Sequence, residues 1–441
     1  MTFKRIALVL VVLVVVAAGG ALAYAMRFPA IAPITPPVAT AFDAGLVERG
    51  ETLAGLGNCS VCHTRQGGED YAGGLPLPTP FGTIYTTNIT PDPETGIGTW
   101  SEDAFIRAMR HGVAQDGSYL YPAFPYDYYS RVTEDDLKAI YAYLMTRDPV
   151  QQAPQPNDMP FPFNNRILMA GWNFLFHTEG EFQPDPNQSD DWNRGAYIVE
   201  GLGHCGACHS PRNMFGAAVK TGPEAYGGGY AEGWYAPPLN ASSISVAPWT
   251  EIAFVNYLID GYDGDHGIAA GPMTPVVDDL YEQSEDDVFA IAAYLMTLRG
   301  ETREESEIED EVAEIRAVAE ALDWNHPNAP ARPTDPVLAR GASVFESQCA
   351  ECHRQNGQPM PLALSSAVNA PDASNLVNIV FYGIQPPPIG ALGRSMPGRA
   401  IQISDEQMAD LAAFVRDRFS DRPAWETVGE AIAAAREAGT H

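Results

Sequence analysis

The hydrophobic pattern of the chain opens with a single long apolar run. Lys4 and Arg5 precede a stretch from Ile6 to Met26 that contains no charged side chain. A helix of this length crosses a bilayer, whereas the apolar core of a signal peptide is usually shorter. We therefore predict that residues 1–28 form a retained transmembrane anchor, with a signal cleaved after Ala25 as the alternative. In both cases the basic flank stays in the cytoplasm and the body of the chain is exported.

Behind this run, amphipathic helical patterns recur three times. In each repeat, a Ser or Thr followed three residues later by an acid or amide marks a helix start. These starts are Thr133, Ser284 and Ser404, and the predicted helices behind them span Leu137 to Met145, Val288 to Met296 and Met408 to Val415. A further helix is predicted in each repeat, at Glu102 to Arg110, Glu251 to Ile259 and Ser374 to Phe381. We find no series of alternating strand patterns, so the predicted fold class is all-α.

The same repeats carry a cysteine motif. Each has an Arg-Gly pair, a short amphipathic stretch and then Cys-x-x-Cys-His, with successive motifs about 145 residues apart. The pairs are Arg49-Gly50, Arg194-Gly195 and Arg340-Gly341, and the motif residues are Cys59, Cys62 and His63; Cys205, Cys208 and His209; and Cys349, Cys352 and His353. We predict three tandem domains, at residues 43–150, 185–300 and 335–420.

The spacing within the motif suits covalent attachment of a haem. Two thiols one helical turn apart can add to the two vinyl groups of a porphyrin, and the following His can bind the iron. A closed zinc site needs four ligands, usually from pairs close in sequence, and a thioredoxin-like pair needs a βαβ context. All six cysteines lie in the motifs, which leaves none for structural disulfides. The sequence thus predicts three haem c groups, with His63, His209 and His353 as iron ligands.

A second iron ligand is predicted in two of the repeats. Met273 stands in Gly-Pro-Met-Thr-Pro and Met396 in Ser-Met-Pro-Gly, each shortly before the last helix of its repeat. The prolines predict rigid, extended loops that present the thioether. The alternative is that either Met only fills the core. Met360 is a rival to Met396 in the third repeat.

The first repeat departs from this pattern. Its corresponding position holds Phe124, in Tyr-Pro-Ala-Phe-Pro, and a phenyl ring cannot bind iron. The first haem is then five-coordinate, or it takes Met109, His111 or Met145 as its ligand. Because a Met ligand raises the potential of a His-ligated haem, we expect this haem to differ in potential from the other two.

The net charge of the chain limits the kinds of partner that it can bind. The chain has 56 acidic and 26 basic side chains, a formal net charge of −30. Such a surface argues against nucleic-acid binding and favours steering towards a basic partner. No nucleophile or acid–base dyad stands out, so we predict electron transfer without independent substrate turnover. The alternatives are a peroxidase-like enzyme that uses an open first haem, and a membrane electron shuttle without a dedicated partner enzyme.

Longer stretches of the sequence resemble a known family. The segments Pro80 to Asp92, Leu120 to Tyr126, Asn193 to Tyr197 and Gly201 to His209 resemble the triple-haem cytochrome c subunits of bacterial membrane-bound dehydrogenases. The resemblance covers about residues 43 to 420. It implies a subunit on the periplasmic face of the inner membrane that passes electrons from a dehydrogenase to ubiquinone or a respiratory cytochrome.

The resemblance also bears on the partner. The partners of the cytochrome subunits in this family are of three kinds: quinoprotein alcohol dehydrogenases, flavoprotein sugar-acid or polyol dehydrogenases, and molybdenum hydroxylases acting on aldehydes or N-heterocycles. Members that serve alcohol dehydrogenases tend to carry Met in the position of Phe124. The Phe124 form resembles the molybdenum group, so a partner that oxidises an aldehyde or N-heterocycle is expected.

Three further expectations concern residues outside the motifs. Residues 159–182 are expected to pack between the first two domains, with the membrane surface and the partner as alternatives. The acidic stretch 301–323 is expected to be a solvated linker helix. His204 and His266 are expected to be surface residues.

Overall fold

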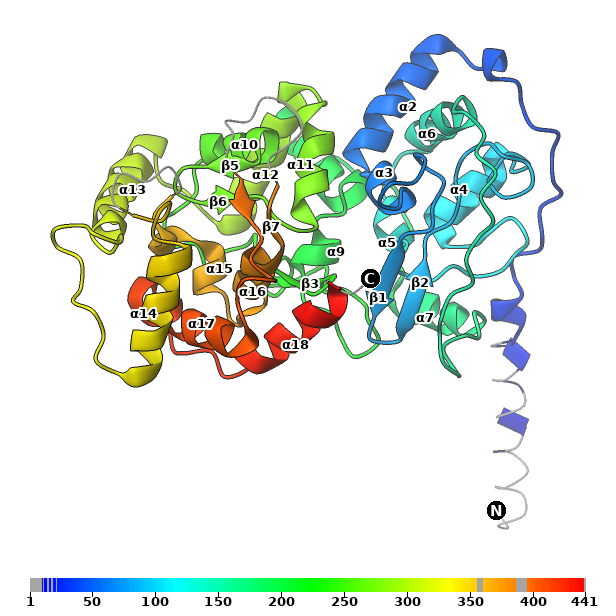
Figure 1. The fold of residues 1–441 in the computed structure, drawn as a ribbon. Helices are drawn as coiled ribbons and strands as arrows, with labels where there is room; N and C mark the ends of the chain where they lie inside the picture. The colour runs from blue at the N-terminus through cyan, green and yellow to red at the C-terminus, as the bar shows by residue number, and fades with distance from the viewer. Residues whose placement is uncertain are drawn as a thin grey trace, which may run out of the picture. The chain divides into compact units, whose positions relative to one another are not determined.

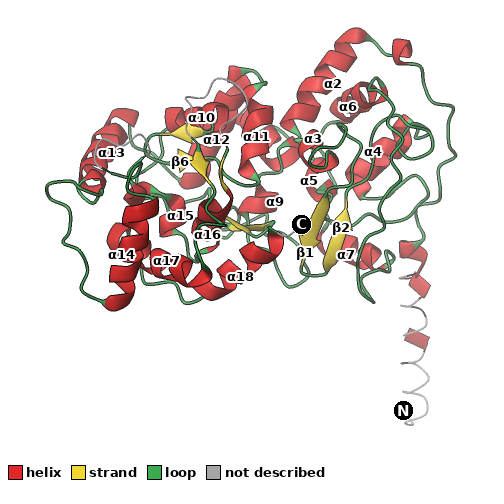
Figure 2. Cartoon of the chain, viewed as in Figure 1, coloured by secondary structure: helices red, strands yellow, loops and turns green. Residues whose placement is uncertain are grey.

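The computed structural model describes residues 22–354, 360–385 and 395–439, together with residues 10, 12, 13, 16, 19 and 20. The chain forms two compact units (Figures 1 and 2). Unit 1 consists of Met1–Gln183 and Glu200–His204, and unit 2 of Pro184–Val199 and Cys205–His441. The third predicted domain and all of the second except residues 200–204 thus lie in unit 2.

Unit 1 contains short helices and one hairpin. The helices are η1 (Ala39–Ala41), α2 (Ala44–Leu56), α3 (Cys59–His63), α4 (Glu102–His111), α5 (Tyr126–Tyr129), α6 (Glu134–Met145) and α7 (Leu168–Phe176). Strands β1 (Pro76–Thr79) and β2 (Gly82–Tyr85) pair antiparallel, with Pro76 opposite Tyr85. The π-helical stretch η2 (Ile198–Leu202) contributes residues to both units.

Unit 2 holds two successive groups of helices. The first group comprises α8 (Asp190–Tyr197), α9 (Gly206–His209), α10 (Glu251–Asp260), α11 (Met273–Tyr281) and α12 (Glu285–Arg299). The second comprises α13 (Glu305–Glu320), α14 (Pro336–Gln348), η3 (Leu362–Leu364), α15 (Ser366–Asn369), α16 (Ser374–Tyr382), α17 (Asp405–Phe419) and α18 (Val428–Ala438). Three antiparallel hairpins accompany them: β3 (Gly229–Ala231) with β4 (Trp234–Ala236), β5 (Tyr262–Asp263) with β6 (Gly267–Ile268), and β7 (Gly383–Ile384) with β8 (Met396–Pro397).

The predicted helices and their starts are confirmed. The side chains of Thr133, Ser284 and Ser404 each accept a hydrogen bond from the backbone N–H three residues later, which satisfies a donor that the helix leaves unpaired. At Ser404 the capping box is complete, because the Gln407 side chain also accepts from the Ser404 backbone N–H at 3.0 Å. The fold is helix-rich, as predicted. The short hairpins were not expected, because strands of two to four residues are too short to show an alternating pattern.

The repeated Arg-Gly pair explains how each repeat closes. Its first helix crosses its last: α2 packs on α6, α8 on α12 and α14 on α17. The glycine sits where the two backbones meet. A Cβ on Gly50 would lie 2.0 Å from the Ala139 carbonyl oxygen, one on Gly195 1.9 Å from that of Ala290, and one on Gly341 2.1 Å from that of Asp410. Only glycine permits this approach, so the motif encodes the helix crossing.

The arginine of each pair locks the same crossing. Arg49 binds Asp136, Arg194 binds Asp287 and Arg340 binds Asp410, with N–O distances of 2.5–3.1 Å. In the first two repeats the carboxylate is the third residue of the last helix, and in the third repeat it lies one turn further along. The pairs of the second and third repeats use both carboxylate oxygens, the stronger arrangement.

The N-terminal segment packs on unit 1. No helix among the described residues is both long and apolar enough to cross a membrane, and much of the predicted anchor, Ile6 to Met26, lies outside the described residues. The last residues of this run and those that follow it pack against the unit. Tyr24 and Phe28 join a cluster around Val113, and the Arg107 guanidinium donates to the Pro29 carbonyl at 2.6 Å. Pro29 therefore begins a segment held against unit 1.

Candidate haem sites

Each Cys-x-x-Cys-His motif forms a single helical turn. The first is α3 itself, the second closes through a hydrogen bond from His209 N to Cys205 O of 2.9 Å, and the third through one from His353 N to Cys349 O of 3.0 Å. Residues three apart on a helix lie on one face, so the two sulfurs of each motif are directed to the same side. All six cysteines are free of disulfides, as a thioether role requires.

The first two histidines are oriented in the same way by the backbone. His63 Nδ1 lies 2.6 Å from the Thr87 carbonyl oxygen, and His209 Nδ1 lies 2.6 Å from that of Pro237. A nitrogen that faces a carbonyl carries the proton, which leaves Nε2 of each ring with its lone pair for a metal. Thr87 and Pro237 are equivalent positions, two residues before Ile89 and Leu239. These carbonyl partners were not predicted, because a backbone carbonyl carries no signature in the sequence.

His353 differs in what surrounds it. Its Nδ1 is buried and has no hydrogen-bond partner among the described residues. The segment that follows directly, residues 355–359, lies outside the described part of the chain. His353 therefore lacks, among the described residues, the carbonyl partner that orients the other two rings.

Burial sets the protonation state of these side chains. It lowers the pKa of His63 and His209, and it lowers that of His353 to about 4. These imidazoles are therefore neutral at pH 7, the form that binds iron. Burial also raises the pKa of Cys205 to about 12 and that of Cys349 to about 11, so both are thiols rather than thiolates. Paired thiols beside a neutral imidazole match the donor set of a haem c.

The predicted second ligands lie in different local structures. Met273 was expected in an extended loop, but it is the first residue of α11. The turn before it is pressed against Trp234, because a Cβ on Gly271 would lie 2.4 Å from the indole ring. The local prediction was wrong because Pro272 takes helical backbone angles (φ −61°, ψ −16°) and starts the helix.

In the third repeat Met396 lies in β8 opposite Ile384. Met396, Met360 and Cys349 all pack against one apolar cluster. The Met360 sulfur, however, lies 3.2 Å from the position of a Cβ on Gly267 in β6, so it contacts the preceding repeat. Met396 is therefore the better-placed candidate.

An aromatic cluster occupies the corresponding region of the first repeat. The ring of Phe124 lies 5.4 Å from that of Tyr129, and the Tyr129 hydroxyl donates to the Gly57 carbonyl, just before the motif, at 3.3 Å. Burial raises the pKa of Tyr129, and the neighbouring Cys59 and Cys62 raise it further. Phe124 thus lies one ring away from the attachment cysteines.

The alternative ligands for the first haem have different surroundings. Met109 and Met145 are core residues with exposed fractions of 5% and 2%. The His111 ring lies 5.2 Å from that of Phe28, tilted by 34°, and its Nδ1 lies 2.9 Å from a Glu179 carboxylate oxygen.

Comparisons with known proteins agree with this chemistry. The family model for cytochrome c matches residues 47–148 and 338–418. The chain is 38% identical over 410 residues to the gluconate 2-dehydrogenase cytochrome c subunit of Pantoea cypripedii, covering 89% of this chain and 90% of that protein. The chain belongs to the cytochrome c subunits of dehydrogenases.

Two other relatives are subunits of dehydrogenases with different substrates in their names. The chain is 34% identical over 414 residues to the cytochrome c subunit of a quinone-dependent alcohol dehydrogenase of Gluconacetobacter polyoxogenes, covering 90% of this chain and 85% of that protein. It is 47% identical over 434 residues to one of the subunits of nicotinate dehydrogenase from Pseudomonas putida, covering 96% of this chain but only 35% of that protein. The cofactor of the family is covalently bound haem c, and its role is electron transfer within dehydrogenase complexes.

Two histidines of the cytochrome subunit lie where the sequence did not predict them. His266 was expected at the surface, but it is buried, with Nδ1 2.6 Å from an Asp263 carboxylate oxygen and its ring stacked on Trp249 at 3.8 Å. His204 packs edge-on against Tyr129 at 5.5 Å, and burial lowers its pKa to about 4. A lone histidine carries no signal that separates core from surface.

Proposed function

We propose that this cytochrome subunit carries three haem c groups and passes electrons from a partner dehydrogenase to the respiratory chain. The observation that carries the proposal is the threefold use of one construction. Each repeat has a motif turn with two sulfurs on one side, and a Gly-centred helix crossing locked by an Arg–Asp pair. His63, His209 and His353 bind the irons, and Met273 and Met396 are the second ligands of the second and third haems.

The protein's contribution to this chemistry is ligation and placement. Iron in the haems exchanges one electron at a time between two oxidation states. Around it, the chain supplies neutral imidazoles, and backbone carbonyls fix the rings of His63 and His209. The formal charge of −30 favours a partner with a basic docking surface.

We assign the partner to the dehydrogenases that oxidise an aldehyde or an N-heterocycle. Phe124 in place of Met supports this choice, and so does the 47% identity to a nicotinate dehydrogenase subunit, since nicotinate is a pyridine carboxylate. The alternatives are a quinoprotein alcohol dehydrogenase and a flavoprotein sugar-acid dehydrogenase; the other relatives are named as cytochrome c subunits of a gluconate 2-dehydrogenase and an alcohol dehydrogenase (quinone).

Cofactor analysis of the native complex decides among these partners. The complex is captured from detergent-solubilised membranes through this cytochrome and analysed for metals and organic cofactors. Molybdenum with iron–sulfur clusters is the expected result. Pyrroloquinoline quinone or flavin in their place would transfer the cytochrome to an alcohol or sugar-acid dehydrogenase.

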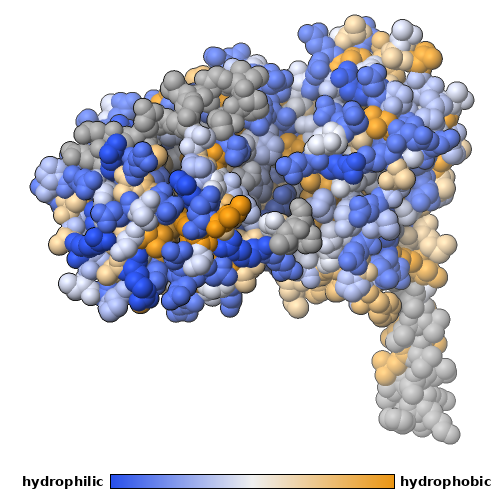
Figure 3. All heavy atoms as spheres, in the orientation of Figure 1, coloured by the Kyte–Doolittle hydropathy of each residue, from blue (hydrophilic) through white to orange (hydrophobic). Residues whose placement is uncertain are grey.

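We also propose that the chain is held at the periplasmic face of the inner membrane by its N-terminal run. The last residues of the run are part of unit 1, since the Tyr24 ring meets that of Phe174 edge-on at 5.6 Å. Cleavage after Ala25 would remove this contact. Large apolar side chains are exposed beside it, with Phe174 and Leu175 on α7 71% and 66% exposed. Figure 3 shows apolar side chains gathered where the N-terminal segment meets the unit.

The anchor is tested on washed membranes. A chain held by a retained helix stays in the membrane fraction after alkaline carbonate washing and begins at its own first residues by N-terminal sequencing. A mature N-terminus at Met26 would show that the run is a cleaved signal.

A further inference from the structure

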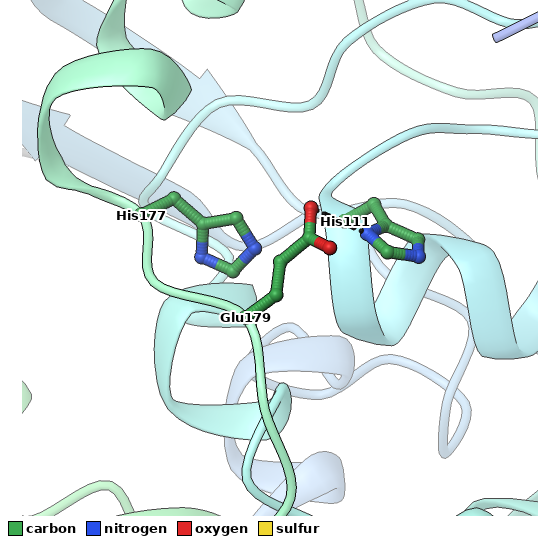
Figure 4. Close-up of side chains that lie close together, drawn as sticks. All are labelled: His111, His177 and Glu179. Atoms are coloured by element: carbon green, nitrogen blue, oxygen red, sulfur yellow. Dashed lines mark ion pairs between the residues drawn. The ribbon is translucent and has the colours of Figure 1, made fainter.

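Outside the haem motifs, one group of metal-binding side chains comes together in unit 1. His111, at the end of α4, lies close to His177 and Glu179, which follow α7 (Figure 4). One potential ligand atom from each residue lies within 4.8 Å of the other two. Two imidazoles and one carboxylate are a donor set that suits zinc and related divalent transition metals.

The histidine rings are oriented as metal ligands are. His177 Nε2 lies 2.8 Å from the Arg110 carbonyl oxygen, so Nε2 carries the proton and Nδ1 the lone pair. Metal-binding histidines usually donate their other ring N–H to a carbonyl or carboxylate in this way. His111 Nδ1 is buried and 2.9 Å from a Glu179 carboxylate oxygen, but this contact does not have the geometry of a hydrogen bond.

The surrounding residues hold the backbone on both sides of the cluster. Asn173 donates to the His111 carbonyl at 3.0 Å and accepts from the Tyr126 hydroxyl at 2.6 Å. The Tyr126 ring also meets the His177 ring edge-on at 5.4 Å. Arg110, the neighbour of His111, forms an ion pair with Glu181, so the Arg110 charge is balanced by a carboxylate other than Glu179. The two ligand-bearing segments are thus fixed to each other by contacts that do not involve the ligand atoms.

We propose that His111, His177 and Glu179 form a zinc site, which goes beyond the electron-transfer role. Two ligand atoms at about 2.1 Å from a tetrahedral zinc lie about 3.4 Å apart, so separations of up to 4.8 Å in the cluster must shorten by at most about 1.4 Å. The Glu179 side chain is 49% exposed, so it has room to make this movement. Its exposure also gives the ion access to the site from solvent. Three protein ligands leave a fourth position for water. The ion would tie the segment after α7 to the end of α4.

The test uses the full-length, haem-loaded chain in detergent, purified without a polyhistidine tag and stripped with a chelator. The protein is equilibrated with Zn²⁺ and dialysed. The number of zinc ions per chain is then measured by inductively coupled plasma mass spectrometry. The expected result is one retained zinc per chain. Glu179→Gln and His177→Gln should each weaken binding by more than the roughly 10–100-fold that follows loss of an outer hydrogen-bond partner.

Matched controls separate this site from adventitious binding. Glu48→Gln removes an exposed carboxylate from the same unit, and His326→Gln removes an imidazole from the other unit. Both should retain zinc like the parent chain, and haem absorbance and circular dichroism verify that every variant is folded. The proposal would be overturned if the parent chain retained no zinc. It would also be overturned if Glu179→Gln and Glu48→Gln retained equal amounts of zinc.

Discussion

The glycine at each helix crossing offers the sharpest test of how the haem domains are built. In Gly50→Ala, the new Cβ would lie 2.0 Å from the Ala139 carbonyl oxygen and 2.8 Å from the Tyr143 Cβ. A carbon–oxygen contact needs about 3.3 Å, so α2 and α6 would have to separate by roughly 1 Å. Neither obstructing atom belongs to a flexible side-chain end. Overpacking of this kind lowers the free energy of unfolding by about 1–3 kcal/mol.

The assay is urea unfolding of the haem-loaded chain, followed by far-ultraviolet circular dichroism and haem absorbance. With a slope of roughly 1–3 kcal/mol per molar urea, the transition of unit 1 should move about 1 M lower. Gly171→Ala is the matched control, because this glycine also lies in a helix of unit 1 and a Cβ there would meet nothing within 4 Å. It should raise stability by about 0.4–1 kcal/mol. Equal midpoints for Gly50→Ala and the parent chain would refute the explanation of the Arg-Gly motif.

Three further predictions concern the haems and pH. In a redox titration, Met273→Leu and Met396→Leu should each lower the reduction potential of one haem and leave the others unchanged. The reason is that a thioether ligand raises the reduction potential. An unchanged titration would show that the Met only fills the core. Phe124→Met should raise the potential of the first haem alone, and a fall or no change would place Phe124 outside that haem's pocket. Burial, and then Glu320, raise the pKa of Asp323 to about 6, so the folded state holds this proton more tightly than the unfolded state. Stability from this group is therefore present below pH 4 and lost as the pH rises to about 6. With solvent screening of a half-exposed group, Asp323→Asn should raise the free energy of unfolding at pH 7 by roughly 1 kcal/mol and not at pH 4; an equal gain at both pH values would contradict the assignment.

The sequence predicted those features that repeat or that depend on local spacing. The helix starts at Thr133, Ser284 and Ser404 follow from hydrogen bonds within one turn, so the local sequence is enough to find them. The Arg-Gly pairs were noticed as a repeat, but their role was not, because the aspartate that each arginine binds lies 70 to 93 residues away. The same limit applies to the carbonyls of Thr87 and Pro237, which are backbone groups and carry no residue signature.

Other features depended on tertiary packing that the sequence does not display. The acidic segment around α13 was expected to be a solvated linker, but Ile308 and Val312 are buried and Arg316 forms an ion pair with Asp265. Two apolar positions one turn apart are too weak a pattern to stand out among so many glutamates. His111, His177 and Glu179 come together only through the packing of α4 against the segment after α7, so no linear motif marks the cluster.

The haem content of the intact chain tests the central claim most directly. The mass of the purified, full-length polypeptide is measured by mass spectrometry under denaturing conditions, which retain thioether-bound haem and release everything else. The account predicts a chain heavier than its polypeptide by three haems, and a loss of one haem when both cysteines of any one motif are replaced by serine. A chain that carries only two haems, or that keeps its full mass after loss of the Cys349 and Cys352 pair, would contradict it.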